Sequence, residues 1–189
     1  MKLQEAIFSV FPFKFHLLWN NSGELIRLKF EFSFDTEAKI LNLTSPKLLD
    51  WIKAFYQAFL DYWNFKKSSV EVPHKILATD FQIVVLKELK KLKIGEVLTY
   101  KKLTERIGYK KAFRAVGKVL SKNPLPLVYP CHRVIGSKGL GGYSQGLLIK
   151  QFLLYRELGY KFLTNNVKNM TKSLQMGLDF KQLVIRHIF

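Results

Sequence analysis

Two segments near the amino terminus alternate between apolar and polar residues, and this alternation constrains the fold more than any other feature. The first spans residues 11–19 and the second residues 26–35, with turn-forming Asn20-Asn21-Ser22-Gly23 between them. A period of two is typical of a half-buried strand, and the intervening residues favour a reversal of the chain. We therefore predict an antiparallel hairpin whose apolar face carries Phe11, Phe13, Phe15, Leu17, Trp19, Ile26, Leu28, Phe30, Phe32 and Phe34.

A helix is predicted after this hairpin. Ser45 is a favourable N-cap residue, and Pro46 suits the first helical position. Apolar residues then recur at helical spacing, which predicts core positions and no ligand contacts. These residues are Leu48, Leu49, Ile52, Phe55, Tyr56, Phe59, Leu60 and Trp63.

The composition limits the class of protein. Apolar residues make up 48% of the 189 residues, so the chain is expected to be globular. A single cysteine excludes an intramolecular disulfide and a cysteine-based zinc site, and the four histidines show no ligand spacing, so no metal is predicted. The chain has no apolar run of about 18 residues and no signal peptide is recognised at its start, so we expect a cytoplasmic protein.

The net charge of +17 favours an anionic partner. Such a field attracts polyanions, nucleic acid being the usual one, or an acidic lipid surface. A lysine-rich solvated surface would give the same total, so charge alone does not choose between these readings.

Three further helices are predicted in the second half. Thr79 and Gln82 have the spacing of a capping box, followed by an apolar face at Phe81, Val84, Val85, Leu89 and Leu92. Thr99 can cap a short helix that runs through Ile107 and stops at Gly108. The third helix is predicted over residues 110–121.

The last two of these helices form a candidate helix-turn-helix. The inner face of the helix at residues 110–121 is Ala112, Val116, Val119 and Leu120. Its outer face combines basic side chains with small residues that let a helix approach a phosphate backbone closely. This outer face consists of Phe113, Arg114, Gly117, Lys118 and Ser121.

Cys131 lies in the segment Pro130-Cys131-His132-Arg133-Val134 and is the only cysteine in the chain. A free thiol has a pKa of about 8.5, and a neighbouring imidazole can lower that pKa or take the proton. A lone cysteine is more often a small buried apolar residue. The surrounding motifs decide between these readings in favour of a nucleophile.

Six motifs occur in one order. They are Gly95-Glu96-Val97-Leu98-Thr99-Tyr100, Ala112-Phe113-Arg114-Ala115-Val116-Gly117, Asn123-Pro124-Leu125-Pro126, Pro130-Cys131-His132-Arg133-Val134, Gly142-Tyr143-Ser144 with Gly146, and Lys150 with Leu153, Leu154 and Glu157. Together they resemble the O6-alkylguanine-DNA alkyltransferase (methylated-DNA–protein-cysteine methyltransferase) family over about residues 80–159. The first 70 residues resemble that family's amino-terminal domain in arrangement only, and the cysteines with which it often binds zinc are absent.

This resemblance implies a fold and a domain organisation. The fold class is α+β (α/β in the broad sense). A scaffold domain at residues 1–72, with a β-hairpin or sheet plus a helix, precedes a mostly helical, winged-helix-like domain with a helix-turn-helix at residues 73–159. Residues 66–73 are interpreted as the linker. Residues 160–189 form an extension of unknown role, with a break suggested at Asn165-Asn166 and an apolar end.

The resemblance also implies the activity. A base carrying an O6-alkyl group, or O4-methylthymine as a further candidate, is flipped out of double-stranded DNA, and its alkyl group passes to Cys131. The thioether product cannot be hydrolysed, so the protein is consumed after one turnover. No metal or other cofactor is implied, and a monomer is expected.

Roles at the reacting atoms are implied for Cys131 as nucleophile, His132 as base through a water, Glu157 as the group that orients His132, and Tyr100 as proton donor to guanine N3. Tyr143, Ser144 and the backbone carbonyls of Cys131 and Val134 are implied to hold the base. Arg133 is expected to brace the loop.

Further roles are implied for DNA contacts. Arg114 is the finger that fills the space left by the flipped base, and Asn123 organises the turn that leads to the reactive loop. Phe113 replaces a residue that is small in many relatives, and the sequence does not show whether it contacts DNA or packs on the scaffold.

Two other functions stay open at this point. An alkyltransferase-like protein binds alkylated DNA without catalysis, but such proteins lack the cysteine. A cysteine hydrolase would use Cys131 and His132, but it usually has a histidine far along the chain and gives no reason for a basic helix-turn-helix.

Overall fold

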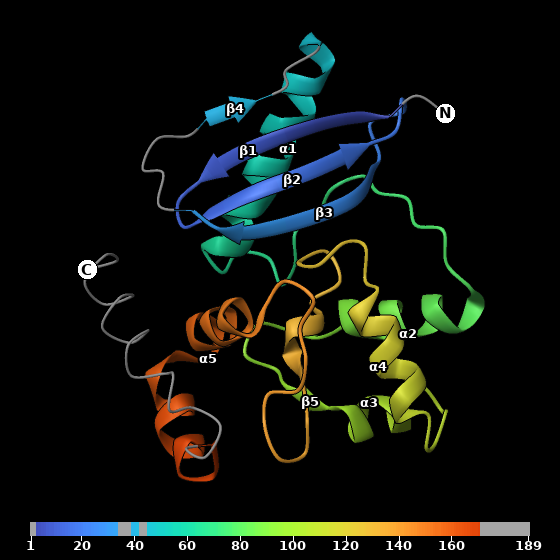
Figure 1. Cartoon of the computed structure of the whole chain (residues 1–189), viewed down its shortest axis with the longest axis vertical. Coiled ribbons are helices and arrows are strands. Elements are labelled where there is room, and N and C mark those ends of the chain that lie inside the picture. The colour runs from blue at the N-terminus through green and yellow to red at the C-terminus, as the bar shows by residue number, and fades with distance from the viewer. Residues whose placement is uncertain (1–2, 34–38, 42–44, 171–189) are drawn as a thin grey trace.

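The computed structural model describes residues 3–33, 39–41 and 45–170 and has an antiparallel sheet as its upper layer (Figure 1). This four-stranded sheet has the order β3-β2-β1-β4. Its strands are β1 (Gln4–Val10), β2 (Phe13–Trp19), β3 (Leu25–Phe32) and β4 (Lys39–Leu41). The predicted hairpin is confirmed as β2 and β3, which pair antiparallel around the turn at residues 20–23. Strands β1 and β4 were not predicted from the sequence.

The pairing of β2 with β3 shifts by one residue near the turn, and this shift corrects the predicted alternation. Leu17 pairs with Leu28 and Leu18 with Arg27, but Trp19 pairs with Leu25. Because a bulge moves the next side chain to the other face, Leu25 is fully buried and Ile26 is only half-buried. Predicted Phe34 lies outside the described residues.

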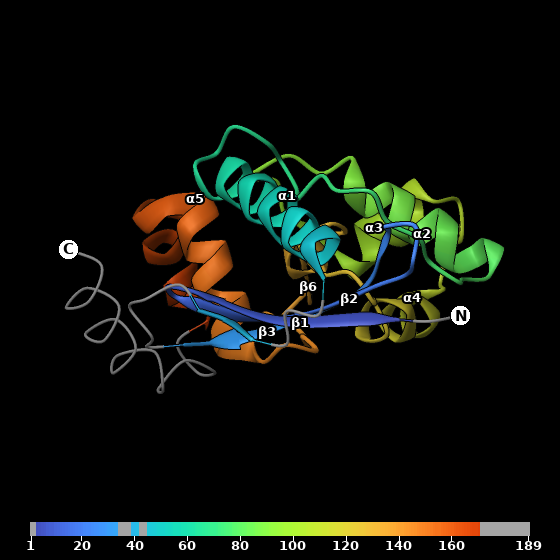
Figure 2. The ribbon, with the colours of Figure 1, turned by 90° about the horizontal axis from the view of Figure 1, so that it is seen from above.

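Helix α1 (Pro46–Trp63) covers one face of the sheet (Figure 2). The Ser45 hydroxyl accepts from the backbone N–H of Leu48 at 3.2 Å, which confirms the predicted cap. Of the predicted core residues, Leu48, Ile52, Phe55 and Phe59 are buried, whereas Leu49, Tyr56, Leu60 and Trp63 are half-buried. Tyr62 is also buried, at 3% exposure, which was not predicted.

The lower layer is mostly helical (Figure 1). It contains α2 (Asp80–Lys90), α3 (Tyr100–Arg106), α4 (Phe113–Ser121), the 3₁₀ turn Cys131–Arg133 and α5 (Leu147–Met170). Short strands β5 (Leu98–Thr99) and β6 (Val134–Ile135) pair in parallel beneath the turn. The predicted α+β class is confirmed, as are the capping box of α2 and the Thr99 cap of α3.

Three predictions about these helices are wrong in detail. Helix α4 begins at Phe113 and not at residue 110, because Lys111 has a left-handed φ of 71° that a helix cannot contain. On α2, Leu86 is buried, whereas Val84 is 37% exposed. The expected break at Asn165-Asn166 is absent, since α5 continues to Met170. The apolar end of the predicted extension at residues 160–189 lies outside the described residues.

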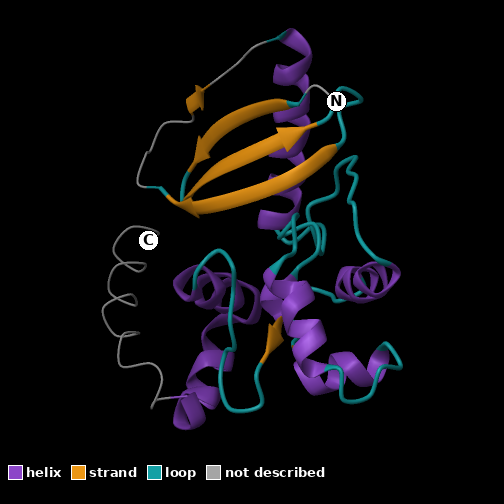
Figure 3. Ribbon diagram, turned by 45° about the vertical axis from the view of Figure 1, so that its right-hand side comes forward, coloured by secondary structure: helices purple, strands orange, loops and turns teal. Residues whose placement is uncertain are grey.

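The lower layer protects the edge of the sheet (Figure 3). Backbone N–H groups of β3 donate to the carbonyls of Pro73 and Pro124, each at 2.8 Å, from Leu25 and Leu28. The Phe30 N–H donates to the side chain of Gln145 at 3.0 Å. The unpaired backbone groups of an edge strand can pair with another chain and cause aggregation. These bonds give the N–H groups of β3 acceptors within the protein and also fix the two layers together. The predicted linker is therefore packed in place, with Val70 fully buried.

Gly23 offers a test of the hairpin turn. A Cβ there would lie 2.6 Å from Trp51 Nε1, and the residue has a φ of +76°. Gly108 has a φ of +77° and open space around it. We expect Gly108→Ala to cost about 1–2 kcal/mol from backbone strain alone and Gly23→Ala to cost more, measured by urea unfolding. Equal losses would show that the Trp51 contact relaxes freely.

Candidate active site

Cys131 begins the 3₁₀ turn and is 3% exposed. The side-chain amide of Asn123 donates to Cys131 Sγ at 3.1 Å and to the Tyr129 carbonyl at 2.8 Å. Asn123 Oδ1 in turn accepts from the backbone N–H of Leu125 at 3.1 Å. One buried amide therefore bonds both to the start of the 123–130 loop and to the sulfur that follows it, which fits the turn-organising role expected of Asn123.

The thiol of Cys131 is a weak acid in this setting. Burial raises its pKa to about 11, although the Asn123 hydrogen bond and the nearby Lys150 oppose that rise. The thiol is therefore protonated at neutral pH. Of the two ways in which an imidazole can activate a cysteine, the structure favours removal of the proton during the reaction over a standing thiolate.

Glu157 on α5 binds the imidazole of His132, with Oε1 2.9 Å from Nε2. Burial alone would raise the pKa of Glu157, but His132 and Arg133 outweigh it and hold that pKa well below its usual range. Burial lowers the pKa of His132, against the opposing effect of Glu157. A neutral imidazole facing a carboxylate must donate through Nε2, so Nδ1 carries the lone pair. Nδ1 is buried and has no hydrogen-bond partner among the described residues.

Arg133 is fully buried and braces this pair. Its guanidinium binds both oxygens of Glu157, with Nε donating to Oε2 at 2.7 Å and a terminal nitrogen to Oε1 at 2.8 Å. It also donates to the carbonyls of Leu92 and Ser68, each at 2.7 Å. These contacts agree with the expected bracing role.

Lys150 holds the loop that lines the other side of the site. Its buried ammonium donates to the carbonyls of Val134 (2.7 Å), Leu140 (2.5 Å) and Gly142 (3.1 Å). Burial lowers the pKa of Lys150 to about 8. The Val134 carbonyl, which is expected to accept from guanine, therefore already accepts from one donor.

Two tyrosines lie near the reactive turn. The Tyr143 ring makes an edge contact with His132, at 6.3 Å between centroids, and its buried hydroxyl has no partner among the described residues. Tyr100 opens α3 and is half-buried, and burial together with nearby Cys131 raises its pKa. Ser144 is exposed and accepts from the Gln145 amide at 3.3 Å.

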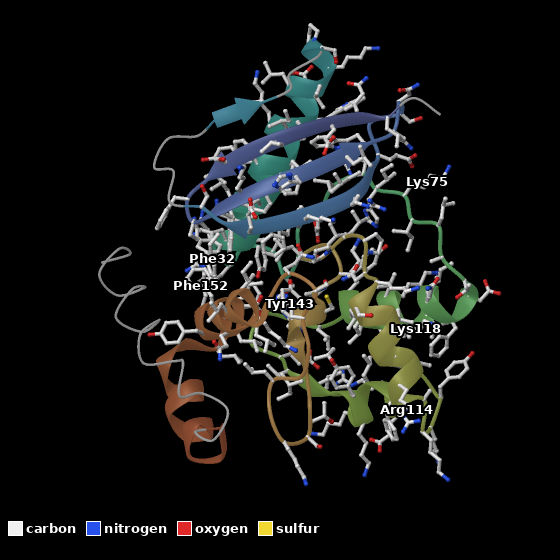
Figure 4. All side chains as sticks on the ribbon, in the orientation of Figure 1. Phe32, Lys75, Arg114, Lys118, Tyr143 and Phe152 are labelled. Carbon is white, nitrogen blue, oxygen red and sulfur yellow. The ribbon has the colours of Figure 1, made fainter. Side chains whose placement is uncertain are left out.

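Helix α4 presents its predicted outer face to solvent. Arg114 and Lys118 lie on that side of the helix (Figure 4), Ser121 is exposed and Phe113 is 42% exposed. Gly117 is half-buried, with the Tyr100 ring 4.0 Å from the position of a Cβ. The structure thus brings Tyr100, Cys131, His132, Tyr143 and Glu157 together and keeps the basic residues of α4 on a separate surface.

One residue of the site was missed. The Tyr62 hydroxyl, from α1, donates to Glu157 Oε1 at 2.8 Å. The spacing of Tyr62 from Phe55 and Phe59 along one helix face could have marked it as buried, but no local signal shows that its hydroxyl meets a carboxylate 95 residues away.

The described residues contain no group of His, Cys, Asp and Glu that could hold a metal ion. Among these same residues, no helix is long and apolar enough to cross a membrane.

Comparison with known proteins agrees with this geometry. Residues 80–159 match the family model of the 6-O-methylguanine DNA methyltransferase DNA-binding domain. The methylated-DNA–protein-cysteine methyltransferase of Methanosarcina barkeri is 44% identical over 115 residues, which cover 57% of this chain and 73% of that protein. That of Metallosphaera sedula is 44% identical over 98 residues, covering 51% of this chain and 62% of the relative.

Solved structures resemble the fold as well. The crystal structure of Mycobacterium tuberculosis O6-methylguanine methyltransferase has a TM-score of 0.64 at 26% identity and covers 83% of this chain and 93% of that one. M. tuberculosis OGT in complex with DNA has a TM-score of 0.59 at 27% identity, over 77% and 86% of the two chains. The chain belongs to the methylated-DNA–protein-cysteine methyltransferase family.

Arg133→Lys tests the brace. An ammonium cannot reproduce the guanidinium fork, so Glu157 would lose part of its pairing in a buried site. We expect a loss of about 3 kcal/mol or more in the free energy of unfolding, measured with urea. Arg106→Lys is the control, because its pair with Glu96 is at the surface and should contribute at most about 1 kcal/mol. Similar small losses in both variants would contradict the brace.

Proposed function

We propose that this protein repairs DNA by direct reversal, transferring the alkyl group of O6-alkylguanine in double-stranded DNA irreversibly to Cys131. The observation that carries the proposal is the arrangement at the reactive turn. A protonated thiol lies in the turn next to an imidazole whose free nitrogen is the one that can accept a proton, with a buried carboxylate fixing the other nitrogen. Family membership and the basic face of α4 support the choice of substrate.

The chemistry uses four side chains. Cys131 Sγ forms a bond to the alkyl carbon while the bond from that carbon to guanine O6 breaks. The thiol proton passes to His132 Nδ1 through a water, and Glu157 stabilises the resulting imidazolium. Tyr100 gives its proton to guanine N3, and the proton held by His132 later restores the tyrosine. The product is a thioether, so each protein molecule reacts once.

Access to the lesion requires base flipping, which costs roughly a few kcal/mol. Arg114 is proposed to enter the stack in place of the base, with Phe113 beside it. Gly117, Lys118 and Ser121 lie against the phosphate backbone, and Asn123 holds the turn that follows. The extruded base lies against Tyr143, Ser144 and the Val134 carbonyl. O4-methylthymine is a second candidate substrate.

We propose that the protein acts as a monomer in the cytoplasm and is associated with the nucleoid when it is bound to DNA. Residues 1–72 are proposed as a scaffold domain and residues 73–159 as the reactive, DNA-binding domain.

Intact-mass spectrometry tests the proposal. After mixing with an oligonucleotide duplex that carries O6-methylguanine, the protein should gain one CH₂ on the peptide with Cys131, at one equivalent per molecule. Cys131→Ser should gain nothing. Binding without a mass gain would indicate a silent binder of alkylated DNA, and product in excess of protein would indicate a hydrolase.

The pH dependence tests the order of proton transfers. The pKa of His132 is lowered from its ordinary value near 6.5, so the base is neutral at and above that pH. We expect the transfer rate to be flat from about pH 6.5 to 7.5, below the pKa of about 8 of Lys150, and to fall at more acidic pH as His132 becomes protonated, measured by single-turnover kinetics. A tenfold rise per pH unit across this range would instead indicate a free thiolate, with its pKa of about 11, as the reacting form.

Arg114→Ala tests the finger. Only duplex DNA requires flipping, so its repair should slow by on the order of 100-fold, whereas attack on free O6-alkylguanine should change little. Phe113→Ala reports whether the neighbouring ring shares this role. Lys101→Ala, an exposed charge at the start of α3, is the control for the loss of one positive charge. Equal losses on duplex and free base would contradict the finger role of Arg114.

A further inference from the structure

Tyr62 links the amino-terminal layer to the reactive site. It lies in the last turn of α1 and is 3% exposed. Its hydroxyl donates to Glu157 Oε1 at 2.8 Å. Burial, followed by the charge of Glu157, raises the pKa of Tyr62 well above its usual value, so the hydroxyl keeps its proton throughout the working pH range.

The oxygen that accepts from Tyr62 is also the oxygen that is bonded to His132, the proposed general base. Glu157 Oε1 accepts from Tyr62, from His132 Nε2 at 2.9 Å and from a terminal nitrogen of Arg133 at 2.8 Å. The other oxygen, Oε2, accepts from Arg133 Nε. Donors that share one oxygen compete for its negative charge, so Tyr62 weakens the hold of the carboxylate on the imidazolium form of His132.

We propose that Tyr62 is a positioning residue that sets the basicity of His132 through Glu157. The proposal rests on the function proposed above, since it assigns His132 the part of base. Tyr62 does not touch the thiol or the flipped base. Through Tyr62, the amino-terminal layer would therefore influence the pH range in which His132 can act as a base. That layer has no other assigned part in the chemistry.

Other charged and titratable groups lie near the His132–Glu157 pair. Arg133 and Lys150 lower the pKa of His132 by charge, and Tyr143 packs its ring edge against the imidazole. Arg156, next to Glu157 on α5, is within electrostatic range of both Glu157 and Tyr62. A Tyr62→Phe variant leaves all of these in place and retains the ring that packs on Phe59 at 6.5 Å between centroids.

The direction of the effect follows from the lost donor. Without the Tyr62 hydroxyl, Glu157 Oε1 carries more negative charge toward His132, so the imidazolium is stabilised and the pKa of the base rises. The acid limb of the rate profile should then move to higher pH by about one unit, which corresponds to the loss of one hydrogen bond to a charged group. The rate on the alkaline plateau should change by less than about threefold, because Cys131 and Tyr100 are untouched.

The experiment compares wild type, Tyr62→Phe and Tyr56→Phe in single-turnover methyl transfer from pH 4.5 to 9. Tyr56 lies on the same helix, is half-buried and packs on Phe8, away from Glu157, so its variant is the matched control. The ring ¹⁵N shifts of His132, recorded against pH on unreacted protein, give the pKa directly and do not depend on activity.

A shift toward higher pH in Tyr62→Phe alone, in both readouts, supports the proposal. An unchanged midpoint overturns it, whether or not the plateau rate falls, because a merely structural role would lower the rate without moving the profile. Failure of wild-type protein to accept a methyl group would instead contradict the proposed function, while the ¹⁵N titration would still decide the part of Tyr62.

Discussion

The buried carboxylate of Glu157 is the group on which the rest of the structure depends. Removing such a charge from water costs several kcal/mol, which only close partners can offset. Here the partners are Tyr62 from the upper layer, His132 and Arg133 from the reactive turn. Arg133 extends the network to the carbonyls of Ser68 and Leu92. One charge therefore fixes α1, the linker, the segment after α2, the reactive turn and α5.

This network couples stability to reactivity. The same carboxylate that is neutralised by Arg133 also fixes the tautomer of His132, which leaves Nδ1 as the acceptor. Burial meanwhile keeps the Cys131 thiol protonated, with its pKa near 11, and shields it from solvent. If the protein reacts only once, as proposed, it benefits from a thiol that is inert until a substrate lies beside it. The buried, protonated state of Cys131 is consistent with that requirement.

Much of the fold could be predicted because it is encoded locally. The β2–β3 hairpin, the Ser45 cap and the Thr79 capping box each depend on residues within a few positions of one another. What could not be predicted depends on distant contacts. The bulge that buries Leu25 reflects pairing across the hairpin, and the edge of β3 is satisfied by Pro73, Pro124 and Gln145 from elsewhere in the chain.

The candidate site likewise combines features that the sequence predicted with features that depend on distant contacts. The motif order pointed to Cys131, His132 and Glu157, and the structure brings these three together. The motifs carried no information on Tyr62, whose hydroxyl meets Glu157 only because the end of α1 packs against α5. Nor did they show that Lys150 occupies the Val134 carbonyl or that burial raises the pKa of Cys131.

The tautomer of His132 is the central claim, and ¹⁵N NMR of the unreacted protein at pH 7 tests it most directly. We expect one proton on the ring, attached to Nε2 and coupled across the hydrogen bond to Glu157, with Nδ1 unprotonated. A proton on Nδ1, in either a neutral or a doubly protonated ring, would contradict it, because His132 could then not accept the proton of Cys131.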